Sequence, residues 1–144
     1  MSDECGTGGK RLKERTREFA LRTVRLYAAL PKSAVAQVLG KQLLRAGTSV
    51  GAHYREGTRS RSNAEFVSKL EGALQELEES RYWLELLEAE RLVPVAALTS
   101  LVREADELAA MLVASVRTVK ARGKAQSVER VAMSDERQAE SDER

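Results

Sequence analysis

The sequence has 144 residues and a mass of 15.9 kDa, which is the usual size of one domain and too small for two independent cores. Hydrophobic residues make up 42%, whereas aromatic residues make up 4% and there are only two prolines, a composition that favours helices over sheets. The formal net charge of +2 points to no particular partner. The single cysteine, Cys5, excludes an internal disulfide, and no apolar run approaches the roughly 18 residues of a membrane span. We therefore expect a soluble, cytoplasmic, helical protein.

The chain divides into three segments. Residues 1–9 are small, polar and glycine-rich, and are predicted to be a flexible leader. Residues 10–122 carry apolar residues at helical spacing and are predicted to form the folded domain. Residues 123–144 lack this periodicity and contain the sequence SDER twice, so they are predicted to be a charged tail that is disordered or at best partly helical.

The first helix is expected from about Lys10 to Leu30, where Pro31 ends it. Ser33 can cap the second helix, and Gly57 is expected as its left-handed C-cap. Glycines inside the second helix cost about 1 kcal/mol each relative to alanine, so they indicate close backbone approach. The apolar face of the first helix comprises Leu12, Phe19, Thr23, Leu26, Tyr27 and Leu30, and that of the second comprises Val35, Val38, Leu39, Gln42, Leu43, Ala46, Val50 and Tyr54.

The third and fourth helices follow the same pattern. Ser62 or Asn63 can cap the third helix, and with Ser62 as the cap Glu65 completes a capping box. Pro94 suits the first turn of the fourth helix. Short connections make neighbouring helices antiparallel, so we predict an all-α, up-down-up-down four-helix bundle. The apolar stripes comprise Phe66, Leu70, Ala73, Leu74, Leu77, Leu84 and Leu87, and then Leu98, Leu101, Ala105, Leu108, Leu112, Val116 and Val119.

Residues that could carry chemistry are scarce. His53 and Glu56 are three residues apart on the second helix, but the chain has one histidine and cannot supply a di-iron or zinc site. No serine has a histidine and aspartate arranged as a triad in the sequence, and the glycine-rich leader lacks the phosphate-loop spacing. The sequence predicts no catalytic residue, no metal and no cofactor, and hence a protein that is not an enzyme.

The small net charge conceals a strong pattern. From Lys10 to Arg61 there are 13 basic and three acidic residues, whereas from Ser62 to Glu107 there are four basic and 11 acidic ones. Residues 108–124 add about +4 and the last 20 residues about −3. Like charges three or four residues apart destabilise a helix, so local helix stability does not explain the pattern.

Two interpretations of the charge pattern are compatible. In the first, a basic surface binds the phosphates of RNA or DNA. In the second, the acidic third helix of one subunit meets the basic helices of the next, which gives head-to-tail assembly. The first interpretation predicts nucleic-acid contacts by Arg11, Arg15, Arg22, Arg25, Lys41, Arg45, Arg55, Arg59 and Arg61. The second predicts a subunit interface with Glu71, Glu78 and Glu85, together with His53 and with Trp83, because one helix face cannot bury Tyr82, Trp83 and Leu84 together.

The segment from Gln42 to Phe66 carries a family resemblance. Gln42-Leu43-Leu44-Arg45-Ala46, then Ser49-Val50-Gly51-Ala52-His53-Tyr54-Arg55-Glu56-Gly57, and then Arg59-Ser60-Arg61-Ser62 with Glu65-Phe66 resemble the four-helix-bundle family of proteins encoded in 23S rRNA intervening sequences. Glu78-Glu79 and the run from Tyr82 to Leu87 are similar to the family's third helix. His53 stands where the family usually has asparagine.

This resemblance implies a non-enzymatic bundle that assembles as a homopentamer around a central channel. The similar accessory variability determinants of diversity-generating retroelements bind nucleic acid and a reverse transcriptase through a basic surface. Our hypothesis is therefore a homopentameric accessory protein that binds RNA or DNA without strong sequence specificity, with a reverse transcriptase or another nucleic-acid enzyme as partner by analogy. The alternative is an interaction module whose charge segregation serves only ring assembly.

Overall fold

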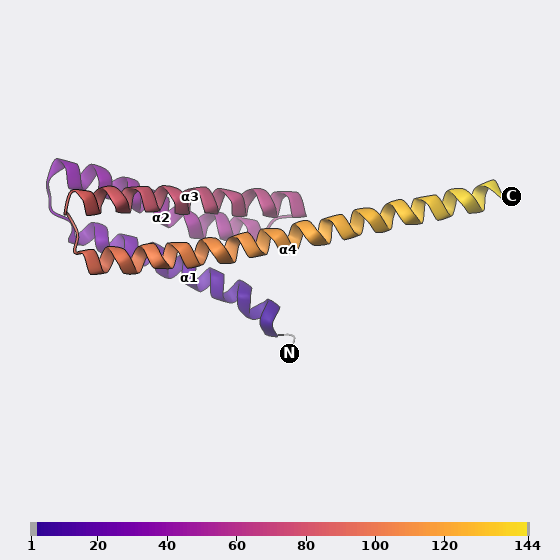
Figure 1. The fold of residues 1–144 in the computed structure, drawn as a ribbon, viewed down its shortest axis with the longest axis horizontal. Coiled ribbons are helices and arrows are strands. Elements are labelled where there is room, and N and C mark those ends of the chain that lie inside the picture. Colours follow the sequence, from indigo (N-terminus) through magenta and orange to yellow (C-terminus); the bar gives the residue numbers. More distant parts are fainter. Residues whose placement is uncertain (1–2, 144) are drawn as a thin grey trace.

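The computed structural model of the protein describes residues 3–143, and it contains four α-helices in this range. Helix α1 spans Asp3–Ala29, α2 Ala34–Thr58, α3 Asn63–Ala89 and α4 Val95–Asp142. Each helix packs antiparallel against the next one in the chain, whereas α1 and α4 contact each other least and diverge toward the N-terminal end of α1 (Figure 1). The predicted all-α four-helix bundle is confirmed.

Local sequence signals explain where the helices begin. The Ser33 hydroxyl accepts a hydrogen bond from the Ala36 amide at 3.3 Å at the start of α2. The Ser62 hydroxyl accepts one from the Glu65 amide at 3.1 Å at the start of α3. The Glu65 side chain accepts from the backbone of Arg61 at 3.4 Å, one residue earlier than a capping box requires. Pro94 is the N-cap of α4, just before the predicted first turn.

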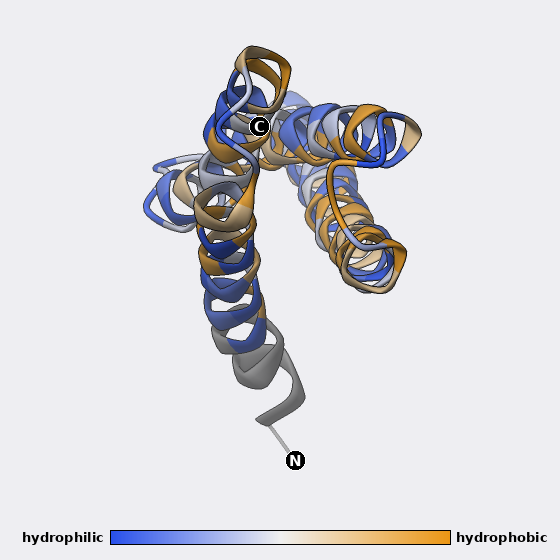
Figure 2. Ribbon diagram, turned by 90° about the vertical axis from the view of Figure 1, so that its left-hand side faces the viewer, coloured by the Kyte–Doolittle hydropathy of each residue, from blue (hydrophilic) through white to orange (hydrophobic). Residues whose placement is uncertain are grey.

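The core follows most of the predicted apolar stripes, with one error on α2. Phe19, Leu43 and Leu77 have almost no solvent exposure. Val35 and Val38, which were predicted to face the core, are 55% and 62% exposed. The start of α2 buries small residues instead, because the α1 side chains approach its backbone too closely for a valine. The buried residues of α2 are Ala36, Gly40, Leu43, Ala46, Gly47, Val50, Gly51, Tyr54 and Gly57. Figure 2 shows that hydrophobic and hydrophilic residues alternate around the helices.

The glycines of α2 mark close approach within the bundle. A Cβ atom at Gly40 would lie 2.5 Å from Leu30 Cδ1, and one at Gly47 would lie 2.5 Å from Thr23 Cγ2. Gly57 is not the predicted left-handed cap, because it lies inside α2 and no described glycine has a positive φ. Gly57 instead makes room for Leu70 of α3, whose Cδ1 would be 2.8 Å from an added Cβ.

Both terminal segments are helical where the structure describes them. Helix α1 already begins at Asp3, and Met1, Ser2 and Arg144 lie outside the described residues. Helix α4 does not end near residue 122 but continues to Asp142, because residues 123–142 contain no proline and only one glycine, and so do not interrupt it. Val116 is its last buried residue, and α4 extends well beyond the other helices (Figure 1). No helix in residues 3–143 is long and apolar enough to cross a membrane.

Candidate nucleic-acid interface

Arg15, a predicted nucleic-acid contact, is bound to carboxylates of its own chain. Its Nε and Nη2 atoms donate to the two oxygens of Glu104 at 2.9 and 2.8 Å, and Nη2 also donates to Glu107 at 2.6 Å. These contacts, the Glu104 hydrogen bond above all, raise the pKa of Arg15 above its usual value. The side chain is only 25% exposed. Arg15 therefore joins α1 to α4 where these helices begin to diverge, and it is not available to a phosphate.

Arg45 is engaged in the same way between α2 and α3. Its guanidinium donates to Glu79 and lies 3.5 Å from Glu76. Glu79 also accepts a hydrogen bond from the Trp83 indole at 3.3 Å. The Arg45 hydrogen bond lowers the pKa of Glu79, and the Trp83 hydrogen bond lowers it further. The partly buried Trp83 thus belongs to a polar cluster on the α2–α3 seam of its own chain.

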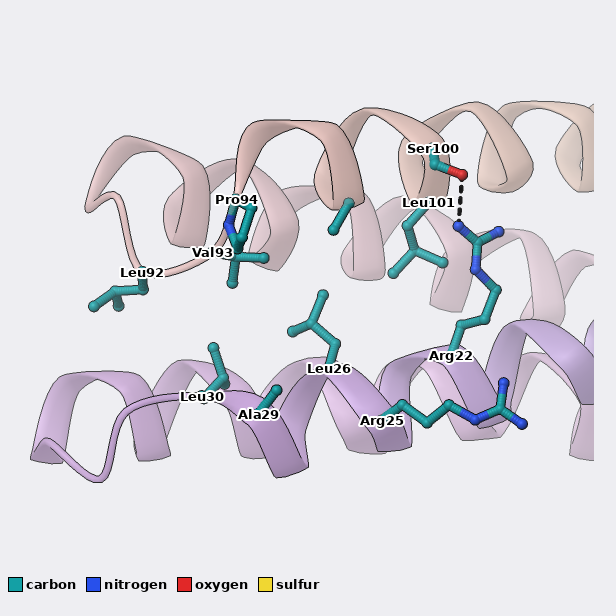
Figure 3. Close-up of a pocket in the computed structure, with 11 residues that line it drawn as sticks. Arg22, Arg25, Leu26, Ala29, Leu30, Leu92, Val93, Pro94, Ser100 and Leu101 are labelled. Carbon is teal, nitrogen blue, oxygen red and sulfur yellow. Dashed lines mark hydrogen bonds between the residues drawn. The ribbon is translucent and has the colours of Figure 1, made fainter.

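Arg22 and Arg25 lie toward the opposite end of α1 from Arg11. Arg22 donates to the Ser100 hydroxyl of α4 at 2.7 Å, as Figure 3 shows, and Arg25 forms an ion pair with Glu18 at 3.1 Å. The predicted basic stripe of α1 is therefore divided among separate contacts. It does not form one continuous free surface.

The other five predicted contacts have exposed side chains with no hydrogen bond or ion pair to another side chain within the described part of the chain. They are Arg11, Lys41, Arg55, Arg59 and Arg61. Four of the five lie at one end of the bundle. Thr16 is next to Gly51, which places Arg55, one turn further along α2, level with the first turns of α1 after Lys10. Arg59 and Arg61 lie in the turn that follows α2. Lys41 lies more than three turns away from Arg55 along α2.

Helix α4 passes the same end and adds four more basic residues. Val119 lines a cavity of about 420 Å³ with the α2–α3 turn and Phe66. Lys120 lies 3.5 Å from Glu71 of α3. The segments 55–69 and 117–124 thereby lie side by side, and segment 11–17 lies level with Arg55 along α1. We call the three segments the basic end. They contain 12 Lys and Arg residues and three Glu residues, and Glu71, Glu104 and Glu107 pair with Lys120 and Arg15 from outside them.

Two of the three glutamates at the basic end are occupied by local contacts. Glu56 accepts a hydrogen bond from Lys69 at 2.8 Å, which lowers the pKa of Glu56. Glu65 accepts from the Arg61 backbone. Arg117, Lys120, Arg122 and Lys124 are not among the contacts predicted from the sequence. The sequence shows the charge of about +4 in their segment, residues 108–124. Only the path of α4 beside the α2–α3 turn, however, connects this segment to Arg59 and Arg61.

The acidic residues that were predicted to form a subunit interface have mixed environments. Glu71 pairs with Lys120, and Glu78 lies 4.0 Å from Arg81. Glu78 and Glu85 line an open groove of about 310 Å³ together with Tyr82, which is 52% exposed. Pairs within the chain, such as Arg15–Glu104 and Arg45–Glu79, also account for part of the charge segregation. The interface roles of Glu71, Glu78, Glu85 and Trp83 stay predictions.

His53, the remaining predicted interface residue, packs on α3 of its own chain. A Cβ at Gly72 would lie 3.2 Å from His53 Nδ1. This nitrogen is buried and has no hydrogen-bond partner among the described residues. No group of three or more His, Cys, Asp and Glu residues in that part of the chain could hold a metal ion. The structure therefore places His53 at a tight helix contact.

The Arg45–Glu79 contact predicts a pH dependence of stability. The pKa of Glu79 is lower in the folded state than in the unfolded state. The contact with Arg45 therefore stabilises the fold fully at pH values above the unfolded pKa, and this stabilisation is lost as the pH falls through the folded pKa. At pH 7 we expect Glu79→Gln to lower the free energy of unfolding by about 0.5 kcal/mol, a value typical of exposed pairs. Urea denaturation should show that this difference narrows below about pH 4. Glu90→Gln, at an exposed glutamate that forms no ion pair among the described residues, is the control, and a difference that persists at pH 3 would contradict the assignment.

Comparisons with known proteins agree with this architecture. The family model described as 23S rRNA-intervening sequence protein matches residues 11–114. A crystal structure at 1.70 Å of a protein of unknown function from the S23 ribosomal protein family of Bacteroides thetaiotaomicron VPI-5482 is 35% identical in sequence, with a TM-score of 0.73. The alignment covers 76% of this chain and 98% of that one. No curated protein matches the sequence. The chain therefore belongs to the 23S rRNA-intervening sequence protein family.

Proposed function

We propose that this protein is a non-enzymatic, cytoplasmic, homopentameric accessory protein that binds RNA or DNA through its basic end. The observation that supports the proposal is the excess of basic residues at that end, where the basic α2–α3 turn lies beside the basic segment 117–124 of α4. Arg55, Arg59 and Arg61 have exposed side chains that are not engaged by carboxylates of the described residues. A planar guanidinium in this state is suited to phosphate.

The chemistry of the basic end supports binding without strong sequence specificity. Contacts between basic side chains and phosphates fix position and supply affinity, but they carry no direct information about bases. The α2–α3 turn offers short polar and basic side chains from Thr58 to Asn63, which suit a phosphate backbone. The basic end therefore fits a ligand recognised by its charge and shape.

Assembly would multiply this charge. In a ring, each subunit contributes one basic end, so a long nucleic acid can contact several of them at once. Exposed Tyr82 beside Glu78 and Glu85 supports a contact surface, since aromatic residues are enriched at interfaces. The pentameric state and a nucleic-acid enzyme as a further partner follow from the family resemblance.

A binding titration tests the proposal. A fluorescent RNA hairpin and a DNA duplex are titrated with the protein at 50 and 200 mM salt, each in two unrelated sequences. We expect similar affinities for the two sequences and a loss of about 10³-fold or more between the salt concentrations if six or more phosphates are contacted. Absence of binding to both ligands at 50 mM salt would overturn the proposal.

The second candidate is an interaction module whose charges serve only assembly. The acidic groove around the exposed Tyr82 favours it. Changing Glu78 and Glu85 to glutamine should lower the mass observed by light scattering if this groove is a subunit contact. Loss of assembly without any nucleic-acid binding by the parent protein would favour this second function.

A further inference from the structure

The far part of α4 is a helix that packs against no other part of the chain among the residues that the structure describes. Residues 125–142, which we call the α4 extension, are all exposed and extend away from the bundle (Figure 1). Val128, Val131 and Met133 are 70%, 62% and 49% exposed. A helix of this length gains little stability by itself in water, and most helical stability in proteins comes from packing an apolar face. The α4 extension thus has apolar side chains and an energetic reason to pack against a surface.

An apolar groove lies at the opposite end of the bundle. It has a volume of about 480 Å³ and runs between the last turns of α1 and the first turns of α4. Leu26, Leu92 and Leu101 supply apolar lining, and Arg22 and Arg25 lie at one edge (Figure 3). We call it the α1–α4 groove. No acidic residue lines it.

The charges of the two elements are complementary. The α4 extension contains five acidic residues and two basic ones, so its net charge is −3. The groove offers two arginines, of which Arg22 is bound only to the neutral Ser100 hydroxyl and can accept a carboxylate partner. A helix with exposed valines and flanking carboxylates matches an apolar groove with arginines at its edge.

The extension and the groove of one chain cannot meet. The groove is formed at the start of α4, whereas the extension is its other end, and α4 is a continuous helix between them (Figure 1). The family match ends at residue 114, so the extension lies outside the shared bundle. Any such contact must therefore join two copies, and it is a feature of this chain beyond the family match.

We propose that the α4 extension of one copy docks in the α1–α4 groove of a second copy, with Val128 and Val131 against its leucines and acidic side chains near Arg22 and Arg25. The contact is head-to-tail, so repetition gives a ring if the rotation closes. This inference rests on the self-association in the proposed function and assigns it a surface, while it is independent of nucleic-acid binding.

Disulfide trapping between two full-length variants tests the contact directly. In a Cys5→Ser background, Ala97→Cys places a thiol in the groove of one protein and Val131→Cys places one on the extension of the other. We expect a mixed disulfide dimer after mild oxidation of the mixture. Val38→Cys, at a site as exposed as Val131 but outside the groove, replaces Ala97→Cys in the control. Equal yields in the two mixtures would overturn the proposal.

Sedimentation of full-length variants gives the second readout. Val128→Ser with Val131→Ser should weaken self-association about tenfold or more, because it removes apolar contact area at the interface. Val35→Ser with Val38→Ser, on exposed α2 sites, is the matched control and should leave it unchanged. A parent protein that is monomeric at all concentrations would refute assembly as a whole. An assembled parent that both pairs of substitutions leave unchanged would refute only this contact.

Discussion

Gly47→Ala is expected to lower the free energy of unfolding by about 1–2 kcal/mol. An added Cβ would lie 2.5 Å from Thr23 Cγ2, 2.9 Å from Oγ1 and 3.1 Å from Cβ. Thr23 cannot turn away easily, because it is fully buried and its hydroxyl donates to the Ala20 carbonyl at 2.7 Å. Overpacking of this kind typically costs about 1–3 kcal/mol, and the better helix propensity of alanine returns about 1 kcal/mol at most. Urea denaturation followed by circular dichroism measures the difference.

Two further variants separate steric overlap from other effects. Gly123→Ala is the matched control, since nothing lies within 4 Å of an added Cβ there, and it should stabilise α4 by about 0.5–1 kcal/mol. Thr23→Ala combined with Gly47→Ala should cost less than the sum of the single changes, because the smaller side chain relieves the overlap. Equal effects of Gly47→Ala and Gly123→Ala would show that α1 and α2 do not approach each other as described.

The sequence was sufficient to predict the bundle because its signals are local and repeated. Apolar residues at helical spacing, prolines between helices, and Ser33 and Ser62 at the helix starts all indicate the same topology. The errors arise at positions where contacts between helices determine which side chains are buried. Val35 and Val38 fit the helical period, but the packing of α2 against α1 and α3 determines which side of α2 is buried. Glycine is the residue typical of a helix C-cap, and only the packing of Leu70 against Gly57 shows that this glycine makes room for a neighbouring helix.

The charged residues illustrate a second limit of prediction from the sequence. Periodicity places Arg11, Arg15, Arg22 and Arg25 on one side of α1, yet Arg15 binds Glu104 and Glu107 from a helix 89 or more residues later in the chain. Sequence spacing cannot show that pairing, because it depends on how helices that are remote in sequence come together. For the same reason it could not connect Arg122 and Lys124 with the α2–α3 turn. For this reason the proposed interface is the basic end and not the stripe on α1.

Replacing Arg55, Arg59 and Arg61 together with glutamine is expected to reduce nucleic-acid affinity about a hundredfold at 0.1 M salt. Each lost phosphate contact removes about 0.9 from the slope of log affinity against log salt for duplex DNA, so the slope should become shallower by 2 to 3. These side chains are exposed and make no ion pair within the described part of the chain, so the fold should keep its stability. Fluorescence titrations at four salt concentrations measure both quantities.

A matched control variant distinguishes binding at the basic end from attraction by the total positive charge of the protein. Lys32, Lys41 and Arg103 are also exposed, have no side-chain partner among residues 11–143 and lie outside the three segments of the basic end, so their change to glutamine removes the same charge. Non-specific attraction to a cationic particle predicts equal losses for both triple variants. Local phosphate contacts predict a large loss only for the first. Because Lys41 belonged to the interface predicted from the sequence, an equal loss in the control variant would favour that wider surface and refute the basic end as the binding site.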